Sequence, residues 1–191
     1  LPLTATPTAE ALLSLLAFQA SRTAARQADD GSLLLLPEQD RSRWDRDLIE
    51  EGFVHLDRGS EGDTLSRFHL EAGIAACHAA APTFQATDWV RIVELYDLLR
   101  ERTPSPIVEV NRAVAVAMVS GAVAGLDELD AIPERDLMAR YPYALAAYGE
   151  LHASLGHVEE AKSYFNRALA CQPVEAQRAV LERKLATLLA E

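Results

Sequence analysis

Apolar residues recur every three to four positions along almost the whole chain, and this periodicity restricts the fold to packed helices. Leucines and alanines lie four residues apart over residues 8–28, and similar stretches follow at about 40–58, 64–80 and 88–100. A period of 3.6 residues is typical of a helix with one buried side, whereas strands alternate every two residues. No stretch alternates convincingly. We therefore expect an all-α fold of about nine helices with short connections.

Capping residues and helix breakers predict where several of these helices begin and end. Ser105 followed by Pro106 predicts an N-cap with proline at the first helical position, and Gly121 should end that helix after about residue 120. Gly59 and Gly62 are expected to end the helix that starts near residue 40, and either Thr87 or Asp88 is expected to cap the helix over about 88–100. The remaining helices are expected at 122–131, 137–154, 157–171 and 173–190.

A short apolar run between the first two helices does not fit the helical period. Residues 32–36 follow a turn signal at Asp29 to Gly31 and stop at Pro37. Because leucine has no strong strand preference, we expect a short extended linker here. The next helix can be capped by Asp40 or by the box-like pattern Ser42-x-x-Asp45.

The last third of the chain resembles a tetratricopeptide repeat. Large, small and aromatic residues are spaced as that repeat requires, at Leu145, Tyr148, Gly149, His152, Gly156, Ala161, Phe165, Ala168 and Pro173. Two positions depart from the pattern, since Leu145 replaces the usual Trp and His152 the usual Tyr. The small residues predict two closely packed antiparallel helices, covered at the open end by the helix over 173–190 through Val174, Leu181, Leu185 and Leu188. A second, degenerate repeat is indicated at about 105–130, with Ala113, Gly125 and Leu129.

Charge and cysteine content limit the partners and the compartment. The 191 residues contain 18 Lys and Arg against 29 Asp and Glu, a formal net charge of −11. Because phosphate groups are repelled by an acidic chain, these residues are a poor nucleic-acid binder by themselves. Cys77 and Cys171 are isolated, as is typical of a reducing cytosol, and the longest uncharged stretch near the start is too short to span a bilayer. We expect a cytoplasmic protein with no membrane segment.

No catalytic or cofactor-binding pattern is present in the sequence. The five histidines lack zinc-ligand spacing, and the glycine-rich phosphate loops and nucleophile motifs are missing. Cys77 and His78 are neighbours that cannot point at each other on a helix. Paired acids such as Glu50 and Glu51 fit a solvated helix face. We expect no catalytic residue, no metal site and no cofactor.

Two groups of polar residues are candidates for protein contacts. The first surrounds Trp44 and consists of Asp40, Arg41, Arg43, Trp44 and Asp45. Internal ion pairing is the favoured interpretation, and a contact surface is the alternative, because Arg and Trp are common at interface hot spots. The second group is Asn111 and Arg112 in an otherwise apolar helix. They either bond a neighbouring loop or line a groove, and the sequence favours neither.

The residues from Ala20 onward resemble the C-terminal extension of a group of extracytoplasmic function (ECF) RNA polymerase sigma factors. The resemblance is carried by Asp30-Gly31, the leucines over 33–36, the string from Gln39 to Asp45, and Ile49-x-x-Gly52. Further matches follow at Tyr96-Asp97, Pro104-Ser105-Pro106, Asn111 to Ala115 and the repeat at the end. The string from Gln39 to Asp45 is the most specific part, because ordinary helical repeats do not require it.

This resemblance implies a bacterial regulatory domain that controls attached sigma regions through protein contacts. Its partners would be those upstream regions, the core RNA polymerase or both, with DNA bound only by regions that precede Leu1. The lack of an initiator Met fits a fragment of a larger protein. Within the chain we expect a helical part over 1–100 followed by repeats over 101–191, in one continuous domain. The alternative function is a sensor whose helical groove takes a peptide or small molecule.

Overall fold

The computed structural model describes residues 6–29 and 31–190, which form ten α-helices and three short 3-10 helices. These residues contain no strand, so the predicted all-α class is confirmed. The chain divides into two compact units, the first over 1–30 and 34–104 and the second over 31–33 and 105–191.

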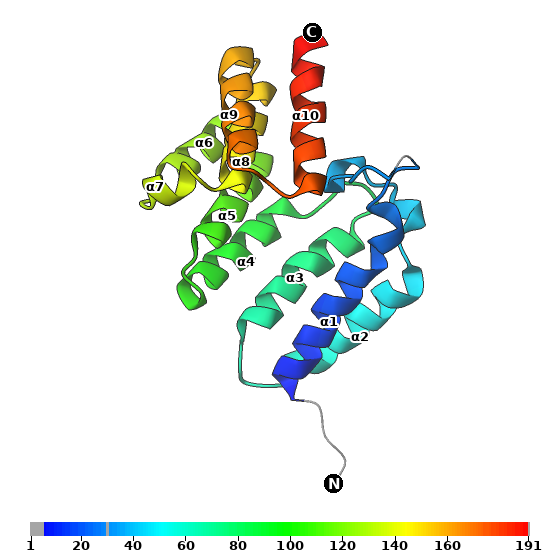
Figure 1. The fold of residues 1–191 in the computed structure, drawn as a ribbon. Helices are drawn as coiled ribbons and strands as arrows, with labels where there is room; N and C mark the ends of the chain where they lie inside the picture. The colour runs from blue at the N-terminus through cyan, green and yellow to red at the C-terminus, as the bar shows by residue number, and fades with distance from the viewer. Residues whose placement is uncertain (1–5, 30, 191) are drawn as a thin grey trace. The chain divides into compact units, whose positions relative to one another are not determined.

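The first unit contains four α-helices (Figure 1), with the three 3-10 turns between the first two. They are α1 (Pro7–Ser21), α2 (Arg46–Ser60), α3 (Arg67–Ala80) and α4 (Trp89–Arg102), and the turns span Thr23–Ala25, Leu36–Glu38 and Arg41–Arg43. Helix α1 packs against both α2 and α3, and α4 packs against α3. Asp88 rather than Thr87 caps α4, because its carboxylate accepts from the Arg91 amide at 2.9 Å.

Two predicted boundaries in the first unit are wrong. The helix expected over 8–28 ends at Ser21, whose hydroxyl turns back to the Phe18 carbonyl at 2.8 Å and whose own carbonyl accepts from the Asp45 amide at 2.9 Å. The helix expected from residue 40 begins at Arg46. Neither proposed cap serves this helix. Asp40 caps the 3-10 turn, and the N-cap of α2 is Asp45 itself rather than Ser42 of the proposed box.

The predicted extended linker is present over residues 32–35, where the Leu34 amide donates to the Arg26 carbonyl at 2.8 Å. Leu36 departs from the prediction because it begins a 3-10 turn that contains Pro37 at one of its first positions. Proline has no amide hydrogen and a fixed φ, which suits the start of a helical turn.

Gly59 does not end its helix, which corrects the sequence prediction. It lies inside α2, where a Cβ would meet the Ala11 nitrogen and the Pro7 oxygen at 3.3 Å. On the same helix, a Cβ on Gly52 would lie 2.6 Å from the Phe18 ring. Gly59 therefore lets the backbone of α1 approach closely, and Gly52 makes room for the Phe18 ring.

The second unit contains the other six helices. They are α5 (Pro106–Ser120), α6 (Ala122–Asp130), α7 (Arg135–Met138), α8 (Pro142–Ser154), α9 (Val158–Ala170) and α10 (Glu175–Ala190). The Ser105 cap is confirmed by a 3.3 Å bond from the Ile107 amide, and Gly121 separates α5 from α6 with a φ of +90°. The single helix predicted over 137–154 is wrong, because Pro142 starts α8 after a break.

Helices α8 and α9 form the predicted close pair. A Cβ on Gly149 would lie 2.6 Å from the Phe165 ring, and Gly156 turns the chain with a φ of +74°. Buried residues from α8, α9 and α10 form one core of Leu145, Ala161, Phe165, Ala168 and Leu181, with Leu185 and Leu188 packed against it. Val174 is exposed and precedes α10, so it is not part of the covering face that was predicted.

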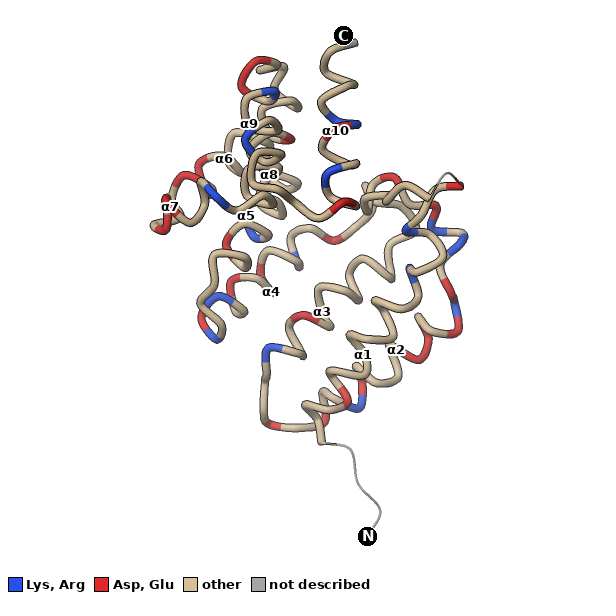
Figure 2. The backbone as a smooth tube through the Cα atoms, in the orientation of Figure 1, with Lys and Arg blue, Asp and Glu red and all other residues tan. Residues whose placement is uncertain are grey.

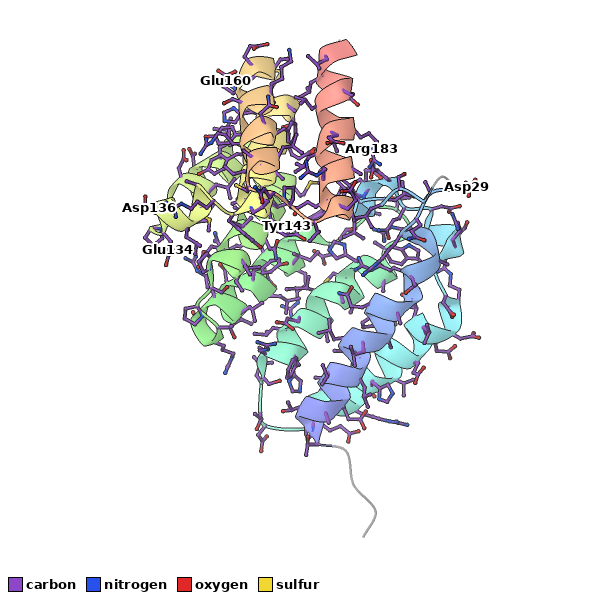
Figure 3. The ribbon with its side chains drawn as sticks, in the orientation of Figure 1. Asp29, Glu134, Asp136, Tyr143, Glu160 and Arg183 are labelled. Atoms are coloured by element: carbon purple, nitrogen blue, oxygen red, sulfur yellow. The ribbon has the colours of Figure 1, made fainter. Side chains whose placement is uncertain are left out.

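The earlier pair, α5 and α6, repeats this use of a small residue. A Cβ on Gly125 would lie 2.5 Å from the Ala117 Cβ, and Leu129 is buried with Ala113 in a core shared with α8. On α10, the Arg183 guanidinium, labelled in Figure 3, donates to the Leu33 carbonyl at 3.3 Å. This bond attaches residues 31–33 to the second unit.

Candidate functional site

Trp44 lies in the centre of the first unit. Only 3% of its surface is exposed, and it packs in one core with Phe18, Ala25 and Ile49 and with alanines of α3. It follows the 3-10 turn and precedes the α2 cap, so it joins the segments that meet between α1, α2 and α3. The indole is a core residue of this unit.

The Arg41 side chain is buried beside Trp44 and binds the end of α3. Its guanidinium donates to the His78 carbonyl, to the Ala81 carbonyl at 2.7 Å and to the Thr87 hydroxyl at 3.4 Å. The guanidinium carbon lies 4.7 Å from the centre of the Trp44 ring. The last carbonyls of a helix have no partner inside the helix, and Arg41 supplies hydrogen bonds to them from a distant segment. Burial lowers the pKa of Arg41.

Two further basic groups, Arg22 and His78, lie close to Arg41. Arg22 lies over the Trp44 ring at 5.8 Å, and burial, with the neighbouring Arg26 and Arg41, lowers its pKa to about 10. Burial also lowers the pKa of His78 to about 4, assisted by the positive charges of Arg22 and Arg41. His78 is therefore neutral at pH 7, and its ring meets Trp89 edge to face with centroids 5.2 Å apart.

The other candidates of this group lie at the surface. Asp40 accepts from the Ser42 hydroxyl at 2.7 Å and from its amide at 2.9 Å, and these bonds lower the Asp40 pKa. Asp45 accepts from the first amides of α2 at 3.0 and 3.1 Å, and Arg43 is exposed. The structure thus brings Arg41 and Trp44 into the core and leaves Asp40, Arg43 and Asp45 accessible to a partner.

An open depression of about 450 Å³ lies beside the Arg41 turn. Its lining comes from the turn and from the segment after α3, namely Pro37, Gln39, Asp40, Arg41, Ser42, Arg46, Pro82, Thr83, Phe84 and Gln85. The Gln39 side-chain oxygen is buried without a hydrogen-bond partner among the described residues. The lining can therefore donate and accept hydrogen bonds.

Asn111 and Arg112 lie in the second unit, on α5. Arg112 reaches α6 and pairs with the Glu128 carboxylate at 2.5 Å, while Asn111 is exposed. The two residues therefore have different environments. Arg112 joins two helices of the repeat, and Asn111 lies on the accessible face of α5.

A stack of rings in the second unit was not predicted from the sequence. Tyr164 of α9 stacks with both Tyr148 and His152 of α8, with ring centroids 4.7 and 5.3 Å apart, and the Arg167 guanidinium lies 4.9 Å from the centre of the Tyr164 ring. A smaller cleft of about 150 Å³ opens beside Tyr148, Tyr164 and Arg167. The sequence signal that could have predicted this stack is the spacing of Tyr148 and His152 four residues apart on α8, and of Tyr164 and Arg167 three residues apart on α9.

Metal ligands do not gather in the part of the chain that the structure describes. No three His, Cys, Asp or Glu side chains among residues 6–29 and 31–190 lie close enough to hold an ion. The His152 and His157 Nδ1 atoms are 3.3 Å apart, which is the distance of one hydrogen bond between them. As for membranes, none of the described helices combines the length and the apolar character that crossing a bilayer requires.

Comparisons with known proteins give two similarities. Residues 2–60 match the model of a family described as a family of unknown function (DUF6596). An uncharacterized protein of Rhizobium meliloti (strain 1021) is 36% identical over 187 residues, which cover 98% of this chain. The same alignment covers 44% of that relative, so the chain spans less than half of its length. No solved structure matches the chain. The family match contains α1, the Arg41 turn and α2, the segments that meet at Trp44.

Proposed function

We propose that this chain is a non-catalytic regulatory domain of an ECF-type RNA polymerase sigma factor. It would act through protein contacts on sigma regions joined to it, in the cytoplasm of a bacterium, and it would leave promoter binding to those regions. The observation that carries the proposal is the string from Gln39 to Asp45. It is the most specific part of the sigma-factor resemblance, and it contains the turn whose residues bond to the ends of α1 and α3 and begin α2. The second support is the length of the Rhizobium relative. The chain aligns with only 44% of that protein, so the relative carries further regions beside the part that matches this chain.

The charge of the chain favours a basic protein surface as the partner. Its formal net charge is −11, and Figure 2 shows acidic residues along several of the helices. Complementary charge accelerates encounter and selects partners, and it weakens as salt screens it. Sigma regions and polymerase surfaces that bind nucleic acid carry the opposite sign. An acidic domain can bind such surfaces without competing for DNA itself.

A binding measurement tests this proposal. The 191-residue chain is immobilised, and separately expressed sigma regions or core RNA polymerase are passed over it at 50 and 300 mM salt. We expect binding to one of the two partners, with a lower association rate at the higher salt. If the chain binds neither partner at either salt concentration, the proposed regulatory contact is refuted.

The second candidate function is a ligand sensor, favoured by the depression beside the Arg41 turn. Its volume of about 450 Å³ is in the range of small-molecule sites, and Gln39 is one of the polar residues that line it. A ligand that binds only the folded state raises the melting temperature by mass action. A thermal-shift screen of peptides and metabolites therefore separates the two candidates. A rise that Gln39→Ala abolishes would favour the sensor.

A further inference from the structure

Helix α1 is apolar on its outward side as well as on its core side. Its only charged residue is Glu10, and the Glu10 carboxylate binds His55 of α2 at 2.5 Å. The side of α1 away from the core carries Ala9, Leu12, Leu13, Leu16 and Ala20, of which Leu13 is 43% exposed and Leu16 is 54% exposed. Figure 2 shows this helix as an almost unbroken uncharged tube. We call these five residues the α1 outer face.

The neighbouring helix α2 has the pattern expected of a surface helix. Its outward side carries Asp47, Glu50, Glu51, Asp57 and Arg58, all exposed. A helix that is apolar all around is normally covered on every side. Helix α1 is covered by α2 and α3 on its core side, where Ala11, Ser14, Ala17 and Phe18 are buried. On the α1 outer face, by contrast, Leu13, Leu16 and Ala20 are exposed apolar side chains that no helix of the first unit buries.

We infer that the α1 outer face is a docking surface for a helix from the rest of the longer protein. This inference rests on the proposed function, because the attached sigma regions are the occupant. The Rhizobium relative leaves 56% of its length outside the alignment, which is ample polypeptide to supply a helix. A covalently joined helix also reaches the surface at a high effective concentration, so a modest apolar contact suffices.

The arrangement of the α1 outer face specifies what kind of helix fits it. Leu12, Leu16 and Ala20 form one ridge four residues apart, and Ala9 and Leu13 form the next. Ridges of this kind accept a second helix whose own apolar residues recur at three and four positions. Since the face is uncharged, the contact adds no salt dependence of its own, unlike the acidic surfaces that attract the partner.

Maleimide labelling of a cysteine placed on this face tests the inference. Leu16→Cys is introduced into the 191-residue chain and into the longer protein, both with Cys77→Ala and Cys171→Ala. We expect the cysteine to react at least tenfold more slowly in the longer protein. Val123→Cys on α6 is the matched control, because Val123 is 60% exposed in the second unit, and it should react equally in both. Equal rates at position 16 would overturn the inference.

Two further outcomes separate this inference from the proposed function. If the isolated chain is a dimer by light scattering and Leu16→Asp makes it a monomer, a second copy covers the face and the inference is wrong. If labelling is unprotected while the chain still binds sigma regions or polymerase, the docking surface fails and the regulatory function stands. If labelling is protected but removal of the chain leaves transcription unchanged, the docking surface stands and the regulatory function fails.

Discussion

The Arg41 guanidinium supplies, for the last turn of α3, hydrogen bonds that the helix cannot make for itself. The sequence singled out Arg41 and Trp44 and favoured a structural role through internal ion pairing over a contact role. The deciding partners are the backbone carbonyls of His78 and Ala81, 37 and 40 residues away along the chain. A backbone carbonyl has no residue signature, so this role could not be predicted from the sequence.

We predict that Arg41→Ala destabilises the chain. Removing it leaves buried carbonyls without partners and uncovers one face of Trp44, so the free energy of unfolding should fall by about 2–4 kcal/mol. Arg41→Lys should lower the free energy of unfolding by a smaller amount, because an ammonium keeps the charge but lacks the planar fork that reaches several acceptors. Urea unfolding followed by circular dichroism measures both. The exposed Arg43→Ala is the control, expected within about 0.5 kcal/mol of the parent. Equal effects at positions 41 and 43 would refute the capping role.

His78 should make stability depend on pH below neutrality. Its pKa is about 4 in the fold against an ordinary 6.5, so between these values the unfolded chain binds a proton that the folded chain excludes. Stability is therefore full above pH 6.5 and falls as the pH drops toward 4, by about 3 kcal/mol at 1.4 kcal/mol per pKa unit.

The variant His78→Phe isolates this contribution, because it keeps a ring against Trp89 and removes the titration. Urea unfolding of both proteins at pH 7.5, 6, 5 and 4 gives the difference. We expect the stability of the variant relative to the parent to increase steadily toward pH 4. Parallel pH profiles for the two proteins would show that His78 titrates normally in the fold.

At the scale of the helix, close packing depends on glycine facing an aromatic ring. Gly52 faces Phe18 between α2 and α1, and Gly149 faces Phe165 between α8 and α9, each at 2.6 Å for an added Cβ. The second pair could be predicted because its spacing follows a known repeat. The contact between Gly52 and Phe18 could not be predicted, because the two residues lie on helices separated by three short 3-10 turns. The close approach at Gly59 was missed because a glycine near the end of a helix was interpreted as its terminator.

Gly149→Ala should therefore destabilise the second unit despite the better helix propensity of alanine. We expect a net loss of about 1–2 kcal/mol, since overpacking against the Phe165 ring exceeds a propensity gain of about 1 kcal/mol. In a Phe165→Leu background the same change should be neutral or stabilising, because leucine leaves room for the Cβ. Chemical denaturation of the four proteins forms a double-mutant cycle. If Gly149→Ala changes the free energy of unfolding equally in both backgrounds, the close contact between Gly149 and Phe165 is disproved.

Asp45 belongs to the same scale, because its carboxylate begins α2. Asp45→Ala should lower the free energy of unfolding by about 1 kcal/mol, the usual effect of losing an N-cap. Glu50→Ala, an exposed change one turn further along, should stay within about 0.5 kcal/mol. If Asp45→Ala leaves stability unchanged but weakens partner binding, Asp45 is a contact residue and the capping explanation is wrong.

Helix boundaries could be predicted where a capping residue, a proline or a glycine stands next to the stretch of helical periodicity. Ser105, Pro106 and Gly121 predicted the start and the end of α5 correctly, because each of them acts on the backbone next to it. The end of α1 could not be predicted, because Ser21 bonds to Asp45 from another segment. Pro142 could have been used to divide 137–154, and the apolar period on both sides of it concealed the break.

For the molecule as a whole, the all-α class followed from periodicity, whereas the function depends on a resemblance. The residues expected to make contacts divide into two kinds. Arg41, Trp44 and Arg112 bind within the chain, so substitutions there should alter transcription by destabilising the fold. Asp40, Arg43, Asp45 and Asn111 are exposed and can act on a partner directly. A loss of transcription without a loss of stability is therefore informative only at the exposed positions.

The central claim is that this chain acts on an attached sigma factor through contact. The most direct test compares promoter-specific transcription in vitro by core polymerase with the longer protein and with the same protein lacking these 191 residues, at equal concentrations and with folding checked by circular dichroism. The account predicts that removing the chain changes the initial rate of transcript formation at least fivefold, and that adding the chain back in excess partly reverses the change. Equal transcription with and without the chain would contradict it.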